Sequence, residues 1–200
     1  MLCVIKHWLL ALSLLFETKK NELNLRHDQV NAVLAYYSVH AGIAARREPS
    51  GLSDEDQLRP DLQLLLDQHN LLIDVTIVHP TCPSHLHKSQ TQLKTAHQAC
   101  EAKKTKYKQL AEQQKAVFIP FAIESFGGLS HSARNLIRTI ATFANDHLSA
   151  WSKEEIITNI NSAIACAVQR GNAITALAGL SSSSSGLVDY FSCILFIRSL

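Results

Sequence analysis

The sequence predicts an α/β fold in which helices flank a small mixed sheet. Three observations indicate it: apolar residues recur at helical spacing, two adjacent apolar runs are typical of a hairpin, and a long polar segment rich in helix formers separates strand-like runs. With 200 residues, of which 46% are hydrophobic and 18% charged, the chain can bury a core. We expect one domain over residues 26–180, preceded by an apolar extension (1–25) and followed by a serine-rich linker with an apolar tail (181–200).

The first half of the domain is expected to hold one helix and three strands. Asp28 can cap a helix that ends at Gly42. Residues 43–48 are consistent with a short strand. Residues 62–67 and 71–79 both have strand character, and the polar residues between them favour a turn, so a hairpin follows.

The second half is expected to add three helices and one strand. Residues 88–114 are dominated by good helix formers and predict the longest helix. Residues 117–123 predict a buried strand, and Pro120 within it indicates a place near the sheet edge. Residues 130–147 and 152–170 predict two more helices, the second stopped by a glycine. The expected order is α-β-β-β-α-β-α-α.

Charge and cysteine content exclude several classes of protein. Nineteen Lys and Arg against seventeen Asp and Glu give a net charge of +2, so a site for a polyanion must be a local patch. The five cysteines are odd in number and contain no C-x-x-C pair, which argues against a disulfide framework and a zinc ribbon. We therefore expect a nuclear or cytoplasmic protein rather than a secreted one.

The apolar ends raise one possible functional class, a membrane-associated or secreted protein. The run from Trp8 to Phe16 is too short to span a bilayer, which takes about 20 residues, and no small-x-small cleavage site follows it. The tail from Leu187 is also too short. No stable membrane partner is expected.

Two acidic residues stand out in the predicted hairpin. Asp74 interrupts an apolar strand, where an unpaired buried carboxylate would be costly, so it requires either a salt bridge or a metal. Asp61 lies at the start of the partner strand, directly after Pro60. Two carboxylates that converge from adjacent strands suit a hard cation such as Mg²⁺ or Mn²⁺, which can polarise a phosphodiester.

A lysine on the following helix is the candidate cation. Lys103 lies on one helical stripe with Ala96, Tyr107 and Leu110, all of which should face the sheet. Such a lysine can extend its ammonium to the surface, or it can reach the carboxylates and stabilise negative charge on phosphorus. Lys106 is the alternative candidate.

These residues together resemble a known family. Arg59-Pro60-Asp61-Leu62, then Asp74-Val75-Thr76 with twelve residues between the two aspartates, then Lys103-x-x-Lys106-Tyr107, is similar to the restriction-enzyme-like endonuclease at the C-terminus of non-LTR retrotransposon polyproteins. That domain belongs to the PD-(D/E)xK superfamily. The superfamily lysine position holds Thr76 here, and the retrotransposon branch resembles this chain in placing its lysine on the next helix.

The resemblance implies a restriction-endonuclease-like core and Mg²⁺-dependent or Mn²⁺-dependent nicking of target DNA before reverse transcription. It also implies roles for six residues: Asp61 and Asp74 as metal ligands, Glu48 as an additional carboxylate, Lys103 or Lys106 as the catalytic cation, and Tyr107 as a supporting residue. The partner would be DNA. A reverse transcriptase domain normally belongs to the same polyprotein, and no polymerase motif occurs here, so a fragment or an orphaned end of an element is expected.

Two further readings stay open. A catalytically inactive, DNA-binding remnant of the same element would keep the fold without cutting. The histidines and cysteine between His79 and His87 could be taken for a zinc site, although their spacing is not that of a zinc finger and a loop is the favoured reading.

Overall fold

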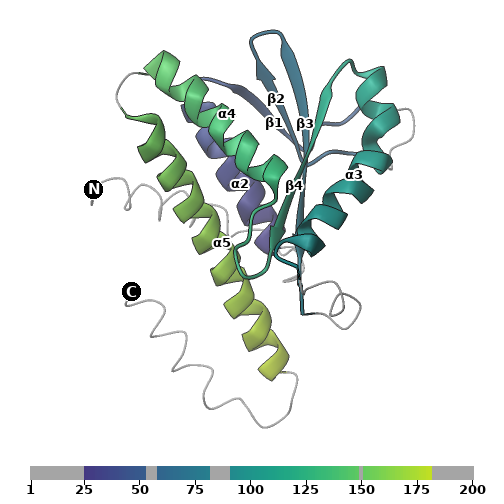
Figure 1. Ribbon diagram of the computed structural model, residues 1–200, viewed down its shortest axis with the longest axis vertical. Helices are drawn as coiled ribbons and strands as arrows, with labels where there is room; N and C mark the ends of the chain where they lie inside the picture. The colour runs from purple at the N-terminus through teal and green to yellow at the C-terminus, as the bar shows by residue number, and fades with distance from the viewer. Residues whose placement is uncertain (1–24, 53–57, 82–90, 149–150, 182–200) are drawn as a thin grey trace.

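The structure, a computed structural model, describes residues 25–52, 58–81, 91–148 and 151–181 (Figure 1). The predicted fold class is confirmed: these residues form an α/β domain with a small mixed four-stranded sheet and four helices. In chain order the elements are α2 (Leu25–His40), β1 (Ala44–Arg47), β2 (Leu62–Leu66), β3 (His69–Val78), α3 (Lys94–Gln113), β4 (Val117–Glu124), α4 (His131–Leu148) and α5 (Lys153–Ser181).

The strands lie in the sheet in their sequence order, β1-β2-β3-β4. β2 and β3 pair antiparallel, as the hairpin pattern predicted, and β1 pairs antiparallel with β2, whereas β4 joins β3 in parallel after the crossover through α3. Pro120 lies opposite Asp74 in this last pairing. Proline has no N–H to donate, and β4 is an edge strand of the sheet, so the predicted edge position is confirmed.

The two faces of the sheet carry different partners (Figure 1). Helices α2, α4 and α5 cover one face, where Ile73, Val75 and Phe121 belong to the main buried core. Helix α3 lies on the other face, where Leu72 packs with two α3 side chains in a smaller cluster. Since neighbouring residues of a strand point to opposite faces, Asp74 shares the α3 face with Leu72.

Three predicted helix boundaries were wrong. α2 begins at Leu25, so Asp28 lies in its first turn and does not cap it. α3 begins at Lys94, after Leu93 in a left-handed conformation, rather than at residue 88. α5 continues through Gly171 to Ser181, so α5 with 29 residues, and not α3 with 20, is the longest helix of the described residues. Arg26 of α2 occupies the space that a side chain at position 171 would need.

Several expectations fall outside the described residues. These are the apolar run from Trp8 to Phe16, the tail from Leu187, and Cys82, His85 and His87 of the histidine cluster. Within the part of the chain that the structure describes, no helix is both long and apolar enough to cross a membrane.

Candidate active site

Asp74 is the buried centre of the candidate site. It lies near the middle of β3 with only 4% of its surface exposed, on the face that α3 covers. Lys103 Nζ of α3 is 2.6 Å from Asp74 Oδ2, and Thr76 Oγ1 donates to the same oxygen at 3.3 Å. The buried carboxylate is therefore neutralised by the lysine that the helical stripe directed toward the sheet.

Asp61 lies directly before β2 and contacts β3 on both sides of Asp74. The backbone N–H of Asp61 donates to Ile73 O at 3.0 Å, and its Oδ2 accepts the Val75 N–H at 2.6 Å. Contacts on both sides of residue 74 hold the second carboxylate at this point of β3.

His27 is a site residue that sequence reasoning missed. Its Nε2 lies 2.9 Å from Asp61 Oδ2, across 34 residues of sequence. The hydrogen bond to Asp61 is the main cause that raises the His27 pKa from 6.5 to about 9; burial opposes it, and Asp28 adds a smaller contribution in the same direction. His27 is thus an imidazolium at neutral pH, so each carboxylate of the site has a cationic partner.

The two candidate lysines occupy different places. Lys103, with 29% of its side chain exposed, contacts Asp74, whereas the Nζ of exposed Lys106 lies 5.4 Å from the Tyr107 ring centroid. A lysine this close to an aromatic face makes a cation–π contact. Of the two, Lys103 is the one that reaches a site carboxylate.

Tyr107 joins α3 to the loop before β2. Its hydroxyl donates to Arg59 O at 3.1 Å, and its ring stacks on Phe118 at 4.5 Å between centroids. Burial is the largest cause that raises the Tyr107 pKa well above its usual value of 10, and Asp74 and Asp61 act in the same direction. The phenol therefore stays protonated and supports the loop that carries Asp61.

Glu48 reaches the site through its backbone. It follows β1 in a left-handed conformation, with φ at 44°, and its N–H donates to Asp61 O at 2.8 Å. Its carboxylate makes an ion pair with Arg59. Among the described residues, no group of three His, Cys, Asp or Glu side chains is placed to hold a metal ion.

His79, the described member of the histidine cluster, belongs to a separate polar contact. Its Nδ1 hydrogen-bonds with Ser125 Oγ, and Thr81 Oγ1 lies 3.1 Å from its Nε2. These contacts join the end of β3 to the end of β4. The His79 ring therefore has a structural role at the ends of the two parallel strands.

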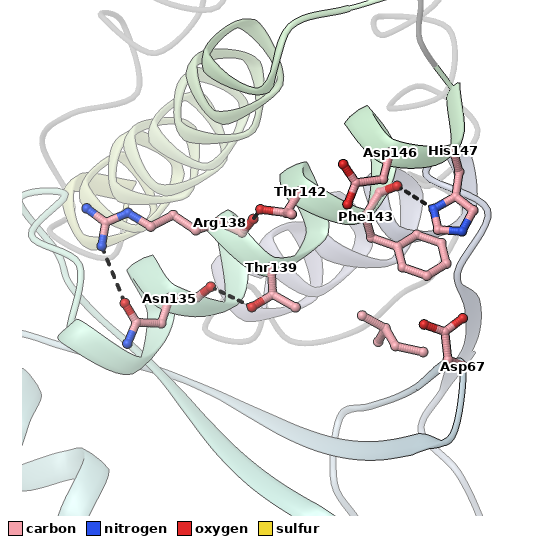
Figure 2. A pocket seen from close by; sticks show the side chains of 9 residues that line it. Asp67, Asn135, Arg138, Thr139, Thr142, Phe143, Asp146 and His147 are labelled. Carbon is pink, nitrogen blue, oxygen red and sulfur yellow. Dashed lines mark hydrogen bonds between the residues drawn. The ribbon is translucent and has the colours of Figure 1, made fainter.

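A concave region of about 570 Å³ lies along α4 and the β2–β3 turn (Figure 2). Figure 2 shows hydrogen bonds between α4 groups, such as His147 Nδ1 to Phe143 O at 2.8 Å. Its α4 lining includes Asn135, Arg138, Phe143, Asp146 and His147. None of the candidate site residues lines it, so it is a different surface of the domain.

Comparisons of this chain with protein-family models and with curated proteins find no match. The functional argument therefore depends on the geometry of the site. Of the residues singled out from the sequence, Asp61, Asp74, Lys103 and Tyr107 come together. Glu48 contributes a backbone hydrogen bond to Asp61, and Lys106 is exposed and lies against the Tyr107 ring.

Proposed function

We propose that this chain is a metal-dependent DNA endonuclease of the non-LTR retrotransposon type, acting in the nucleus or cytoplasm. The observation that carries the proposal is the contact between Lys103 and Asp74, with Asp61, directly before β2, accepting the N–H of Val75, the residue after Asp74. Two carboxylates and one lysine from adjacent elements can supply what metal-assisted hydrolysis of a phosphodiester uses: oxygen ligands for a cation, and a positive charge for the phosphate.

The donor set suits Mg²⁺ or Mn²⁺. Asp61 and Asp74 would hold the ion through their carboxylate oxygens, and Mg²⁺ sites with one or two protein carboxylates keep waters for a substrate phosphate. When bound, the ion would polarise the phosphodiester and lower the pKa of a bound water.

Lys103 would supply the positive charge for the transition state. Its stem is held in the α3 stripe, and its ammonium is partly exposed beside Asp74, so it would present a positive charge to a phosphate at this place. Tyr107, packed between Lys103 and Lys106 on α3, limits where both ammonium groups can move. Lys106, exposed beside Tyr107, would contact a phosphate next to the one that is cleaved.

An inactive DNA-binding remnant is the second candidate, and one observation favours it. Lys103 and His27 already neutralise Asp74 and Asp61, so the site satisfies its own charges without a metal. In that case the lysines of α3 would still bind the DNA backbone, and no cleavage would follow.

Nicking of supercoiled plasmid by the full chain, with Mg²⁺ or with EDTA, tests the proposal. Asp74→Asn removes the ligand charge, and Asp67→Asn is the matched control, because Asp67 is exposed in a left-handed turn conformation that asparagine also adopts. Nicking that needs Mg²⁺, survives Asp67→Asn and is lost in Asp74→Asn supports an endonuclease. DNA binding without nicking by the folded wild-type chain would establish the remnant instead.

A further inference from the structure

Gly171 stands in the interior of α5, where glycine is an unfavourable residue. It is buried, and the side chain of Arg26 from α2 crosses it. A Cβ at position 171 would lie 1.8 Å from Arg26 Cγ, a distance that real Cβ atoms do not adopt, and 3.0 Å from Arg26 Cβ and Cδ, which is a tight contact. Glycine is therefore required here by the close approach of an arginine from another helix.

The guanidinium of Arg26 is held by Asn172, the residue after Gly171 in α5. Arg26 Nη1 donates to Asn172 Oδ1 at 2.8 Å, and Asn172 Nδ2 donates to Ser125 O at 2.7 Å. Ser125 directly follows β4 and is itself buried. Arg26 therefore ties the first turn of α2 to α5 and, through Asn172, to the end of the sheet.

The first turn of α2, which carries Arg26, also makes contact with Asp61. His27, adjacent to Arg26, contacts Asp61 Oδ2 at 2.9 Å, and Asn31, one turn further on, donates to Asp61 O at 3.2 Å. We infer that Arg26, Gly171 and Asn172 form a positioning clamp that fixes His27 against Asp61 and so sets the place of the Asp61 carboxylate beside Asp74. The catalytic consequence of the clamp rests on the proposed function; its effect on His27 does not.

Thermal unfolding tests whether the absence of a side chain at position 171 is needed to accommodate Arg26. By helix propensity alone Gly171→Ala should raise Tm. We expect it to lower Tm instead, because the new methyl group strikes Arg26 Cγ. In an Arg26→Ala background, which has no Cγ, the loss of Tm should largely disappear. An equal loss of Tm in both backgrounds would overturn the clamp.

The hydrogen-bonded Nε2 proton of His27 tests positioning, independently of cleavage. Proton NMR of the full chain near pH 6, with His27→Gln as the assignment control, should show this resonance in wild type and in Asn161→Ala, an exposed α5 substitution. We expect it to broaden or vanish in Gly171→Ala and in Asn172→Ala. Asn172→Asp keeps the acceptor for Arg26 but loses the donor to Ser125 O, so the resonance should be weaker than in wild type and stronger than in Asn172→Ala.

Nicking kinetics then test the catalytic consequence. A misplaced Asp61 should lower kcat by about 10-fold to 100-fold in Asn172→Ala, with KM nearly unchanged. An unchanged His27 resonance in both Gly171→Ala and Asn172→Ala would refute the inference. A wild-type chain that fails to nick, but whose His27 resonance depends on Asn172 as described, would reject the proposed function and still support the clamp.

Discussion

At the Asp61 carboxylate, charge and hydrogen bonding come from residues distant in sequence. His27 contributes the cationic partner, and Val75 contributes a backbone N–H. Asp74 receives its partner from Lys103 on α3. Each buried or half-buried carboxylate is thus stabilised by a partner from another element, and loss of either cation would leave a charge poorly compensated.

The His27 contact predicts a pH-dependent stability. The folded-state pKa is about 9 against 6.5 for an unperturbed histidine, so the contribution is complete below pH 6.5 and is lost as the pH rises through about 9. Because a third of the ring is exposed, we expect a contribution on the order of 1–2 kcal/mol. Urea unfolding in EDTA across this range should show the decline in wild type but not in His27→Gln. Parallel profiles for the two proteins would contradict it.

Tyr107→Phe tests the support of the loop that carries Asp61. The substitution removes the hydrogen bond to Arg59 O and keeps the stack on Phe118, so we expect a loss of about 1 kcal/mol in the free energy of unfolding. Chemical denaturation measures it. Equal stability of the two proteins would show that the hydroxyl contributes nothing to the fold.

Sequence reasoning could identify Asp74 and Lys103, because each breaks a local pattern, and Asp61 because it stands at the start of the strand that pairs with Asp74's strand. A charge in an apolar strand and a lysine in an apolar helical stripe are visible without a structure. His27 breaks no such pattern: it begins an ordinary helix, and nothing in the sequence sets its distance from Asp61. Only the packing of α2 against the sheet brings the two together.

At the scale of elements, strands were easier to predict than helix ends. The hairpin and the edge strand follow from alternation, turn residues and Pro120. Gly171 was misread as a stop because glycine usually ends a helix. Here its missing side chain serves a contact from α2, more than a hundred residues earlier in the chain, which local rules cannot reveal.

The small cluster under α3 predicts how firmly that helix is held. Leu110 is 1% exposed and packs with Leu72 and Tyr107. Leu110→Ala should cost about 2–4 kcal/mol of unfolding free energy, because the helix can close only part of the cavity. Denaturant unfolding measures this cost, with exposed Gln109→Ala as the control. A cost below about 1 kcal/mol would mean that α3 packs more loosely than described.

For the whole molecule, a net charge of +2 leaves DNA binding to a local surface. Exposed lysines of α3 lie on one side of the sheet, whereas exposed Arg138 lies on α4, on the other side (Figure 1). DNA affinity should fall steeply between about 50 and 200 mM salt. Lys106→Ala should reduce the slope of log affinity against log salt by about one, and Arg138→Ala should leave it unchanged. Equal effects of the two substitutions would rule out α3 as the DNA-binding side.

The central claim is that the Asp74 and Lys103 pair is a catalytic centre rather than a buried salt bridge. The most direct measurement is the Mg²⁺-dependent nicking rate of Lys103→Met beside Lys104→Met, its exposed neighbour on the same helix, which pairs with Glu101. At saturating DNA, where a lost phosphate contact does not limit the rate, we predict that Lys103→Met lowers the rate by about 100-fold or more while Lys104→Met keeps it near wild type. Equal rates in two folded variants, or a wild-type chain without Mg²⁺-dependent nicking, would contradict the claim.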